Sequence, residues 1–377
     1  MNRILLAVTM LFLLLCNARE AMAYKFLKTC GGTPAKWASN VYAVSADTNF
    51  SSGPWRTALS SVVNSWNNNP SFLGYSISYG DTSVALGNGQ SEVWWAPNPG
   101  FVAATYTWLA TSPPCRYTEA DIVFNSTPTL TTPPGYPWID TPDKANIFTY
   151  GGNYRSFQSA AIHEFGHAGG LGHTANTYSV MGTEYTHLST NGSIARGYVG
   201  EDASAGMVAL YGLWPNGPED VAVVHWRWDG TATPDDPPTG GYSNHCRTRI
   251  FSSAGTVLPL VSDGGNPCYG KEPSYIVSRG QTVLLELTYE NLGKSTQMIT
   301  NGYYLSADST ITTADQFLGG NSFAIARNTA YTATVQLVIP TNVTSGYHWL
   351  GAVVDYIGAI KELHEDNNAT YVGIWVQ

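Results

Sequence analysis

The chain has 377 residues, which is long for a single domain and sufficient for two. Hydrophobic residues make up 43% of it and charged residues only 12%, which is about half of the usual charged share. The formal net charge of −9, without a cluster of Lys and Arg, excludes a nucleic-acid-binding protein and a protein held on anionic lipid by a basic patch.

The first residues have the pattern of a signal peptide. Arg3 precedes an apolar run from Ile4 to Leu15 that is too short to span a bilayer as a helix, and Ala21-Met22-Ala23 is an A-x-A cleavage site. We therefore expect residues 1–23 to be removed and the protein to be secreted and extracellular. Cys16 leaves a lipoprotein as the alternative, although the bulky Leu15 before it does not suit a lipidation site. No transmembrane segment is expected elsewhere.

The first half of the chain is predicted to combine strands with three helices. Apolar residues recur at helical spacing from Trp55 to Trp66, which predicts a helix over 54–67 that Ser52 can cap. Further helices are expected over 157–169 and 203–211, each ended by glycine. Strands are expected at 41–44, within the alternating stretch 72–108 and at 120–125, and a surface loop at 126–142.

The composition changes at 215–218, and the rest of the chain has the pattern of strands. The clearest are 221–228, 282–289, 302–305, 331–339, 347–356 and 371–376, with regular turn signals between them. This pattern is typical of an all-β sandwich. We predict two domains, 24–214 and 215–377, the second with an insertion at about 231–270 that is rich in Pro, Gly and Asp.

Removal of the signal peptide leaves four cysteines, an even number that indicates two disulfides in an exported protein. We expect Cys30–Cys115 and Cys246–Cys268, because these pairings keep each bridge within one half of the chain. Four cysteines allow three pairings, so the other two stay open.

The segment from His163 to His173 has the pattern H-E-x-x-H-x-x-G-x-x-H. Residues four apart lie on one face of a helix, so His163 and His167 can direct their imidazoles at one ion. The third ligand requires the chain to turn back, and Gly170 permits that turn because glycine tolerates positive φ. His173 then completes a three-histidine site with an open position, which is typical of catalytic zinc.

Glu164 adjoins the first ligand and reaches the open side of the predicted metal. Zinc lowers the pKa of a bound water to about 7, and we expect Glu164 to take the proton of that water as it attacks a carbonyl. The pattern thus predicts one catalytic Zn²⁺ ion. The alternatives are a helix with buried, hydrogen-bonded histidines and a zinc site without activity, against which the intact Glu164 argues.

This pattern resembles that of the metzincins, and Gly170 to His173 resembles its form in the matrixins, the matrix metalloproteinases and their bacterial relatives. The resemblance covers about residues 24–212. Ser179-Val180-Met181 lies where metzincins place the methionine of their Met-turn, beneath the zinc ligands. The resemblance implies a zincin-type α+β domain with a mixed twisted sheet and three helices.

The likeness extends to the substrate cleft and the closing helix. The spacing from Met181 to Tyr185 matches the tyrosine that walls the pocket for the side chain just past the cleaved bond, although Thr183 replaces the usual proline between them. Tyr185 could instead donate to the transition state, as a tyrosine does in astacin-like relatives. Glu201-Asp202, Met207 and Leu210-Tyr211-Gly212 resemble the closing helix of matrixins.

Ala120 to Phe124 is similar to the edge strand along which matrixins bind an extended substrate. The resemblance makes Asp121, Ile122 and Val123 candidate substrate contacts. Cys30 to Pro34 resembles the cysteine switch that keeps matrixins latent, but the preceding Pro-Arg is absent. The switch would require Cys115 to be free.

Short motifs in the second half resemble the cell-adhesion-related domain (CARDB) of bacterial surface and secreted proteins; they are Glu290–Gly293, Tyr303–Asp308, Ile311–Asp315 and Glu365–Asn368. The resemblance implies an immunoglobulin-like sandwich over about 220–377, interrupted by the insertion. Asp308, Asp315 and Asp366 leave Ca²⁺ binding open without a clear motif, the alternative being turn residues. Such a domain could bind substrate, bind a surface or matrix, or act as a spacer.

We therefore predict a secreted zinc metalloendopeptidase that acts as a monomer on extracellular proteins or peptides. The competing predictions are a non-catalytic zinc-containing adhesion protein and a zinc amidase acting on cell-wall peptides. The other histidines lack ligand spacing and are expected at the surface or in hydrogen bonds; they are His187, His225, His245, His348 and His364. His187 alone lies near the site in sequence and is an alternative substrate contact.

Overall fold

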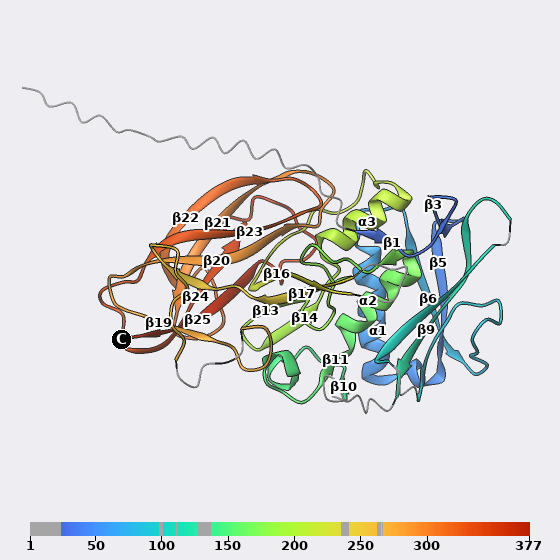
Figure 1. Ribbon diagram of the computed structural model, residues 1–377, viewed down its shortest axis with the longest axis horizontal. Helices are drawn as coiled ribbons and strands as arrows, with labels where there is room; N and C mark the ends of the chain where they lie inside the picture. The colour runs from blue at the N-terminus through green and yellow to red at the C-terminus, as the bar shows by residue number, and fades with distance from the viewer. Residues whose placement is uncertain are drawn as a thin grey trace, which may run out of the picture.

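Figure 1 shows a computed structural model of the chain, which describes residues 24–97, 101–110, 112–126, 137–234, 241–261, 265 and 267–377. The predicted signal peptide and part of the predicted loop at 126–142 lie outside the described residues. The blue-to-green part of the chain forms the right side of Figure 1, and the orange-to-red part forms the left side. None of the described helices has the length and apolar character needed to cross a membrane.

A six-stranded mixed sheet forms one wall of the N-terminal half. Its strands are β4 (Lys36–Trp37), β5 (Val41–Asp47), β6 (Gly74–Asp81), β7 (Glu92–Ala96), β8 (Ala103–Leu109) and β9 (Arg116–Asn125). β6, β5, β7 and β9 run parallel, and β8 pairs with β9 in the antiparallel direction. The strands expected at 41–44, within 72–108 and at 120–125 are therefore present.

The segment expected to be the edge strand is an inner strand. Ile122 on β9 lies opposite Val93 of β7 on one side and opposite Thr105 of β8 on the other. Asp121, Ile122 and Val123 are buried, so the prediction that this segment is an edge open to a substrate strand is wrong. The edge is β8, which pairs only with β9 in the described chain. The sequence of a strand with neighbours on both sides is typically apolar along its length. Such an apolar sequence does not show which strand lies at the edge of the sheet.

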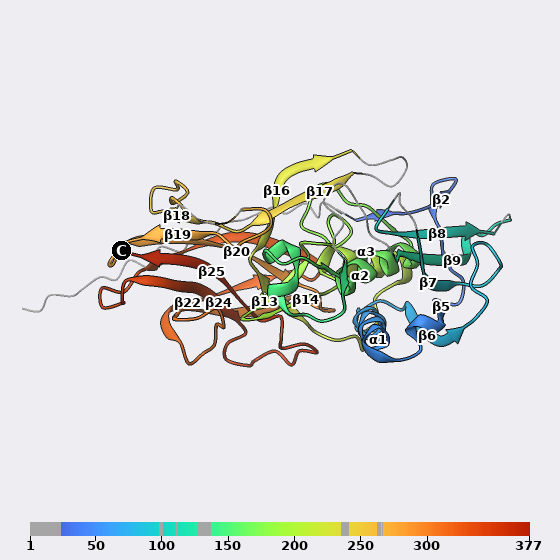
Figure 2. The same ribbon diagram turned by 90° about the horizontal axis from the view of Figure 1, so that it is seen from below.

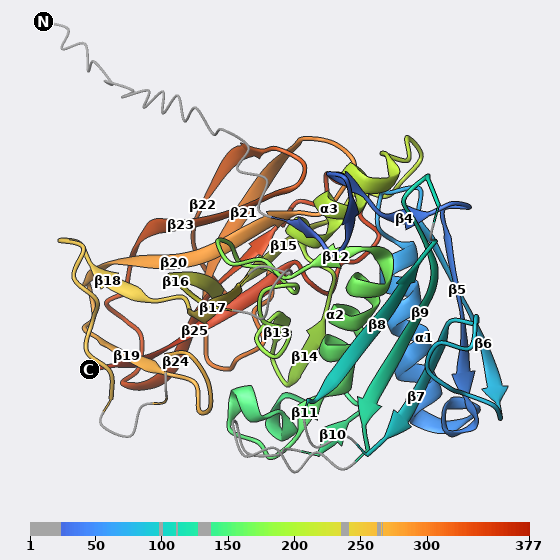
Figure 3. The ribbon, with the colours of Figure 1, turned by 45° about the vertical axis from the view of Figure 1, so that its right-hand side comes forward.

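Three helices share a hydrophobic core with this sheet: α1 (Gly53–Asn67), α2 (Phe157–Gly169) and α3 (Glu201–Tyr211). Figure 3 shows α1 and α2 behind strands β8 and β9. The apolar positions that predicted α1 are buried except Trp55, which is partly buried. Ser52 occupies the N-cap position, but its side chain makes no capping hydrogen bond, so the predicted cap is wrong. Pro54 lies in the first turn, where its missing N–H is not needed.

Short elements connect the sheet to the helices. They are β1 (Lys25–Phe26), β2 (Thr29–Cys30), β3 (Thr33–Pro34), β10 (Trp138–Ile139), β11 (Arg155–Ser156), β12 (Leu171–Gly172), β13 (Leu188–Asn191), β14 (Ile194–Gly197) and the 3₁₀ helices η1 (Thr48–Phe50), η2 (Lys144–Asn146) and η3 (Phe148–Tyr150). The Cys30–Cys115 disulfide joins β2 to the segment before β9. The cysteine-switch alternative is wrong for this structure, because both thiols are in that bond.

The C-terminal half consists mainly of two sheets that share one hydrophobic core. The four-stranded sheet contains β15 (Val221–Val224), β18 (Ile250–Ser252), β20 (Thr282–Asn291) and β23 (Thr329–Val338). The five-stranded sheet contains β19 (Ser274–Val277), β21 (Gln297–Ser306), β22 (Gln316–Ile325), β24 (Gly346–Val354) and β25 (Ala369–Val376). Strands are present at all the predicted positions of this half, and β18, β19 and β22 of these sheets, together with the strand at 242–247, were not predicted.

The strand expected at 221–228 is divided into two strands of different sheets. β15 ends at Val224 and pairs with β20, whereas β16 (Trp226–Thr233) begins two residues later and pairs with β17 (Tyr242–Arg247). The expected insertion therefore contains half of a hairpin, and the Cys246–Cys268 disulfide holds its second strand. Figure 2 shows this β16–β17 hairpin reaching from the C-terminal half over the N-terminal half.

The two halves of the chain are joined by a continuous packed junction. Trp226 and Val224 share a hydrophobic cluster with Tyr150, Tyr178 and other residues of the N-terminal half. The side chain of Asn191 on β13 donates to the Ile311 carbonyl over 3.0 Å and accepts from the Ile311 N–H over 2.7 Å. Because the junction is both apolar and hydrogen-bonded, the hairpin is held in a fixed place against the N-terminal half.

Candidate metal centre

Helix α2 supplies the first two candidate ligands, and both are oriented by backbone carbonyls. The Nδ1 atom of His163 lies 2.7 Å from the Val180 oxygen, and that of His167 lies 2.7 Å from the Leu171 oxygen. A carbonyl oxygen only accepts, so each Nδ1 carries the hydrogen and each Nε2 of the neutral ring presents a lone pair. This is the arrangement by which proteins fix the tautomer of a metal-binding histidine.

Gly170 returns the chain from α2 to the third candidate ligand. It caps the helix with φ of 109°, and a Cβ on it would lie 2.9 Å from Leu210 Cδ2. Strand β12 follows and pairs with β1, which places the Nε2 atom of His173 3.1 Å from that of His163 and 3.0 Å from that of His167. The turn predicted at this glycine is therefore present, and the three ring nitrogens converge.

The three histidines fit a zinc ion. Among the described residues they are the one group of three or more His, Cys, Asp or Glu side chains whose ligand atoms lie within 4.8 Å of one another. A tetrahedral ion with Zn–N bonds of about 2.0–2.1 Å separates its ligand nitrogens by roughly 3.3 Å, close to the observed distances. Burial, with the neighbouring His167 and His163, lowers the pKa of His173. The ring is therefore neutral, as a metal ligand must be.

Glu164, the helical neighbour of His163, is held by a residue of the edge strand. The Thr105 hydroxyl on β8 lies 2.6 Å from Glu164 Oε2 and 3.0 Å from the Glu164 carbonyl oxygen. Burial raises the pKa of Glu164 to about 8, the hydrogen bond from Thr105 lowers it, and Glu184 raises it. Glu164 can therefore hold a proton near neutral pH, and Thr105 is a site residue that the sequence pattern did not indicate.

Met181 is buried against the helix that carries the first two ligands. A Cβ on Gly166 would lie 2.5 Å from the Met181 sulfur, so the glycine between the two helical histidines makes room for it. The Met181 carbonyl accepts from the Thr174 N–H over 3.1 Å, directly after His173. The segment around Met181 thus contacts helix α2 and the residue that follows the third candidate ligand.

Tyr185 and His187 have different surroundings. The Tyr185 ring packs 5.5 Å from the ring of Phe148 and lies near the Arg155 guanidinium. His187 is fully buried, with its ring 4.5 Å from Tyr178 and 4.3 Å from Tyr198. His187 is therefore part of a packed aromatic stack, and the alternative that it contacts substrate is wrong.

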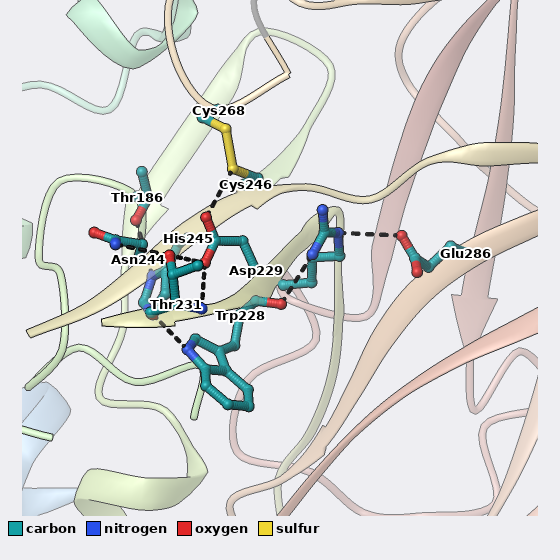
Figure 4. The surroundings of a disulfide bond; sticks show 10 residues. Thr186, Trp228, Asp229, Thr231, Asn244, His245, Cys246, Cys268 and Glu286 are labelled. Atoms are coloured by element: carbon teal, nitrogen blue, oxygen red, sulfur yellow. Dashed lines mark hydrogen bonds and ion pairs between the residues drawn. A yellow bond between two sulfur atoms is a disulfide. The ribbon is translucent and has the colours of Figure 1, made fainter. Parts of the chain in front are cut away.

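The β16–β17 hairpin contacts the segment that carries the third ligand and Met181. The ring of Tyr242 lies 4.0 Å from that of His173, and the His245 ring bonds to Thr186 over 2.9 Å. Figure 4 shows His245 and Thr186 near the Cys246–Cys268 disulfide. The sequence pattern did not indicate this contact, because the hairpin lies in the segment interpreted as an insertion.

The three aspartates considered for calcium accept hydrogen bonds or pair with a cation. Asp308 Oδ1 accepts from the Thr310 N–H over 2.8 Å, and Asp315 Oδ2 accepts from the Thr312 N–H over 2.7 Å. Asp366 forms an ion pair with Arg196. These contacts are those of turn and surface residues.

Residues 107–212 match the family model of the matrixins. This part of the chain is a matrixin-like domain. It contains Glu164 and all three converging histidines, and it is therefore of the zinc metallopeptidase type. A search of curated protein sequences finds no match.

Several solved structures are similar to part of the chain. The crystal structure of the CARDB domain of a Pyrococcus furiosus protein, in complex with di-metal ions, shares 18% identity over 27% of this chain and 79% of that chain, with a TM-score of 0.22. Its solution structure shares 20% identity over 28% of this chain and 88% of that chain, with a TM-score of 0.22. The C-terminal domain of wzt shares 11% identity over 35% of this chain and 71% of that chain, with a TM-score of 0.20.

Proposed function

We propose that the protein is a secreted zinc endopeptidase that hydrolyses peptide bonds of extracellular proteins. The observation that carries the proposal is the convergence of the His163, His167 and His173 Nε2 atoms, with the buried Glu164 next to His163 in the same helix. Two of these rings have their Nδ1 hydrogens engaged by carbonyls, so lone pairs face one another unless a cation lies between them. The carboxylate of Glu164 is left for proton transfer.

His163, His167 and His173 would hold the zinc ion, which would supply a Lewis acid for the scissile carbonyl and the attacking water. Glu164 takes the proton of that water at its carboxylate and passes it to the amine that leaves. Thr105 holds Oε2 of Glu164 over 2.6 Å, which restricts the carboxylate to one direction. Burial raises the pKa of Glu164 toward neutral pH, where a carboxyl group can both take up and return a proton.

The substrate proposed for this site is an extended peptide that adds to the edge of β8. This edge strand lies beside the histidine helix, because its Thr105 contacts Glu164. An unpaired edge offers N–H and C=O groups at the spacing of a further strand. Tyr185, packed on Phe148, is proposed to wall the pocket for the side chain past the cleaved bond.

The proposed mature chain begins after a signal peptide at 1–23 and has domains at 24–214 and 215–377. The second is proposed to be an immunoglobulin-like sandwich of the CARDB type, from its two sheets around one core. Two disulfides, Cys30–Cys115 and Cys246–Cys268, support export to an oxidising compartment. The hairpin strand within the 231–270 insertion is proposed to belong functionally to the catalytic site.

The proposal is tested by casein or gelatin cleavage with the wild-type chain and with Glu164→Ala. We expect cleavage by the wild type, loss of cleavage in the variant, and one bound zinc per chain in both. Zinc binding without cleavage by the wild type would instead support a non-catalytic adhesion protein. Release of cell-wall peptides without casein or gelatin cleavage would support a zinc amidase.

A further inference from the structure

The hairpin strand β17 is attached to the metal-site segment by backbone and side-chain hydrogen bonds. Ser243 donates to the Thr174 carbonyl from its N–H over 2.9 Å and from its hydroxyl over 2.8 Å. The Thr183 hydroxyl donates to the Ser243 carbonyl. Thr174 follows His173, and Thr183 lies two residues after Met181, so one hairpin residue links both segments of the site.

The hairpin and the metal-site segment approach each other so closely that a side chain would not fit at Gly182 or at Gly241. A Cβ on Gly182 would lie 2.8 Å from the Ser243 hydroxyl. A Cβ on Gly241, beside Tyr242, would lie 2.6 Å from the Thr233 carbonyl and 3.3 Å from Ala175 Cβ. The hairpin backbone thus lies close to Ala175 and Gly182 of the metal-site segment, which limits the movement of Tyr242 relative to His173.

The rest of β17 is anchored as firmly. The His245 ring bonds to the Thr186 hydroxyl over 2.9 Å, and the Arg247 guanidinium donates to the Thr149 carbonyl of the N-terminal half. Cys246 is joined to Cys268. These bonds fix the part of β17 that directly follows Tyr242, which limits the movement of the Tyr242 ring.

Tyr242 covers the third candidate ligand. Its ring centroid lies 4.0 Å from that of His173, with the planes tilted by 36°, so the two rings are in direct contact. His163 and His167 are oriented by carbonyls of the matrixin-like domain itself, whereas His173 receives this ring from the other half of the chain. We infer that Tyr242 is a positioning residue of the zinc site, which the hairpin of the second domain thereby completes.

This inference rests on the proposed function, because it assumes that the histidines bind zinc. Outer partners of metal-binding histidines typically contribute 10- to 100-fold to metal affinity. Removing the Tyr242 ring takes away one of the contacts that orient the His173 ring, so zinc should bind more weakly and the coordination geometry should change. The ring performs this role by packing, so phenylalanine should replace tyrosine.

The experiment uses the full chain with Tyr242→Ala, Tyr242→Phe and the control Tyr347→Ala. Tyr347 packs 4.7 Å from Trp375 in the second domain, so its removal also deletes an aromatic pair. The zinc Kd is measured by chelator competition, and the site geometry by the visible spectrum of the Co²⁺-substituted protein. We expect about tenfold weaker zinc binding and an altered Co²⁺ spectrum for Tyr242→Ala, and values near the wild type for the other two variants.

Unchanged zinc affinity and Co²⁺ spectrum in Tyr242→Ala would overturn the inference, and so would tighter binding, which would mean that the ring obstructs the site. A Tyr242→Phe variant as weak as Tyr242→Ala would also overturn it, because the hydroxyl would then be responsible. If Tyr242→Ala does not fold, Tyr242→Leu keeps the bulk without the aromatic ring, and the same loss is expected. A wild type that binds no zinc would refute the proposed function itself.

Discussion

The helical histidines and the third histidine are supported in different ways. His163 and His167 lie on one face of α2, and each Nδ1 bonds to a carbonyl of the matrixin-like domain. His173 lies after a glycine turn and packs against Tyr242 of the β16–β17 hairpin. A short motif can therefore specify the positions of the ligands, whereas the rigidity of the third ligand also depends on a segment far along the chain.

The largest effect is expected from variants that lose a ligand nitrogen, whether from helix α2 or from His173 beside the hairpin. His163→Ala, His167→Ala and His173→Ala should each weaken zinc binding by far more than the roughly 100-fold loss that an outer partner causes, because each deletes a metal bond. Equilibrium dialysis with zinc analysis measures this, with His348→Ala as the control in the second domain. A His173→Ala variant that still binds zinc as the wild type does would show that the hairpin side is not part of the site.

A substitution at Gly170 tests the turn that connects the two sides. Gly170→Ala combines positive φ with a Cβ 2.9 Å from Leu210 and 3.2 Å from Tyr117, whereas Gly255 has positive φ with nothing within 4 Å. We expect Gly255→Ala to cost about 1 kcal/mol of unfolding free energy, and Gly170→Ala about 2 kcal/mol more through overpacking. Denaturant unfolding measures both, and equal costs would contradict the proposed close packing at the turn.

The junction that holds the hairpin side should respond to pH through Glu290. Tyr198 donates a hydrogen bond to the Glu290 carboxylate, and burial raises the pKa of Glu290 from 4.5 to about 7. Between these values the folded chain holds a proton that the unfolded chain has released, so the free energy of unfolding falls as pH rises through this window. The loss is at most about 3 kcal/mol.

Glu290→Gln should make the decline between pH 5 and 8 shallower, since glutamine does not ionise. Asp202 and Asp220, whose pKa burial also raises to about 7, should leave a residual decline. Denaturant unfolding across this pH range provides the measurement. Buried histidines with a lowered pKa, such as His225 and His245, change the stability of both the wild type and the variant in the opposite direction. The difference between the two pH profiles is therefore the test, and identical profiles would contradict the account of the junction.

The smallest expected effect concerns the helix side, where Thr105 holds Glu164. Thr105→Val removes a hydrogen bond to a carboxylate, a contact that is worth about 1.5 kcal/mol or more, so kcat/KM should fall about tenfold while zinc stays bound. The same bond lowers the pKa of Glu164, so its loss should move the acidic limb of the pH–rate profile to higher pH. Thr105→Ser should restore both kcat/KM and the position of the acidic limb. An acidic limb that does not move in Thr105→Val would show that Thr105 does not act on Glu164.

The ligand half of the site could be predicted from the sequence because it is local. His163 and His167 are spaced by the period of the helix, and Gly170 is required by a backbone conformation that other residues avoid. Glu164 follows from its place beside the first ligand. The three helices were predicted for the same reason, since each buries an apolar face at regular spacing.

The supports of the site could not be predicted because they are distant along the chain. Thr105 is 59 residues from Glu164, and Ser243 is 69 residues from Thr174, with no periodic pattern to link them. The Pro-, Gly- and Asp-rich composition that indicated an insertion concealed β17, whose buried residues include polar Ser243 and His245. The edge strand was assigned to β9 instead of β8 because pairing order is a property of the assembled sheet.

The central claim is that His163, His167 and His173 together hold one zinc ion, and crystals of the full zinc-loaded chain test it most directly. An anomalous difference map at the zinc absorption edge should contain one peak, bonded to the Nε2 atoms of these three histidines and to no fourth side chain. The Tyr242 ring should lie on His173 in the same map. A peak at another position, or a zinc ion coordinated by a fourth protein side chain, would contradict the claim.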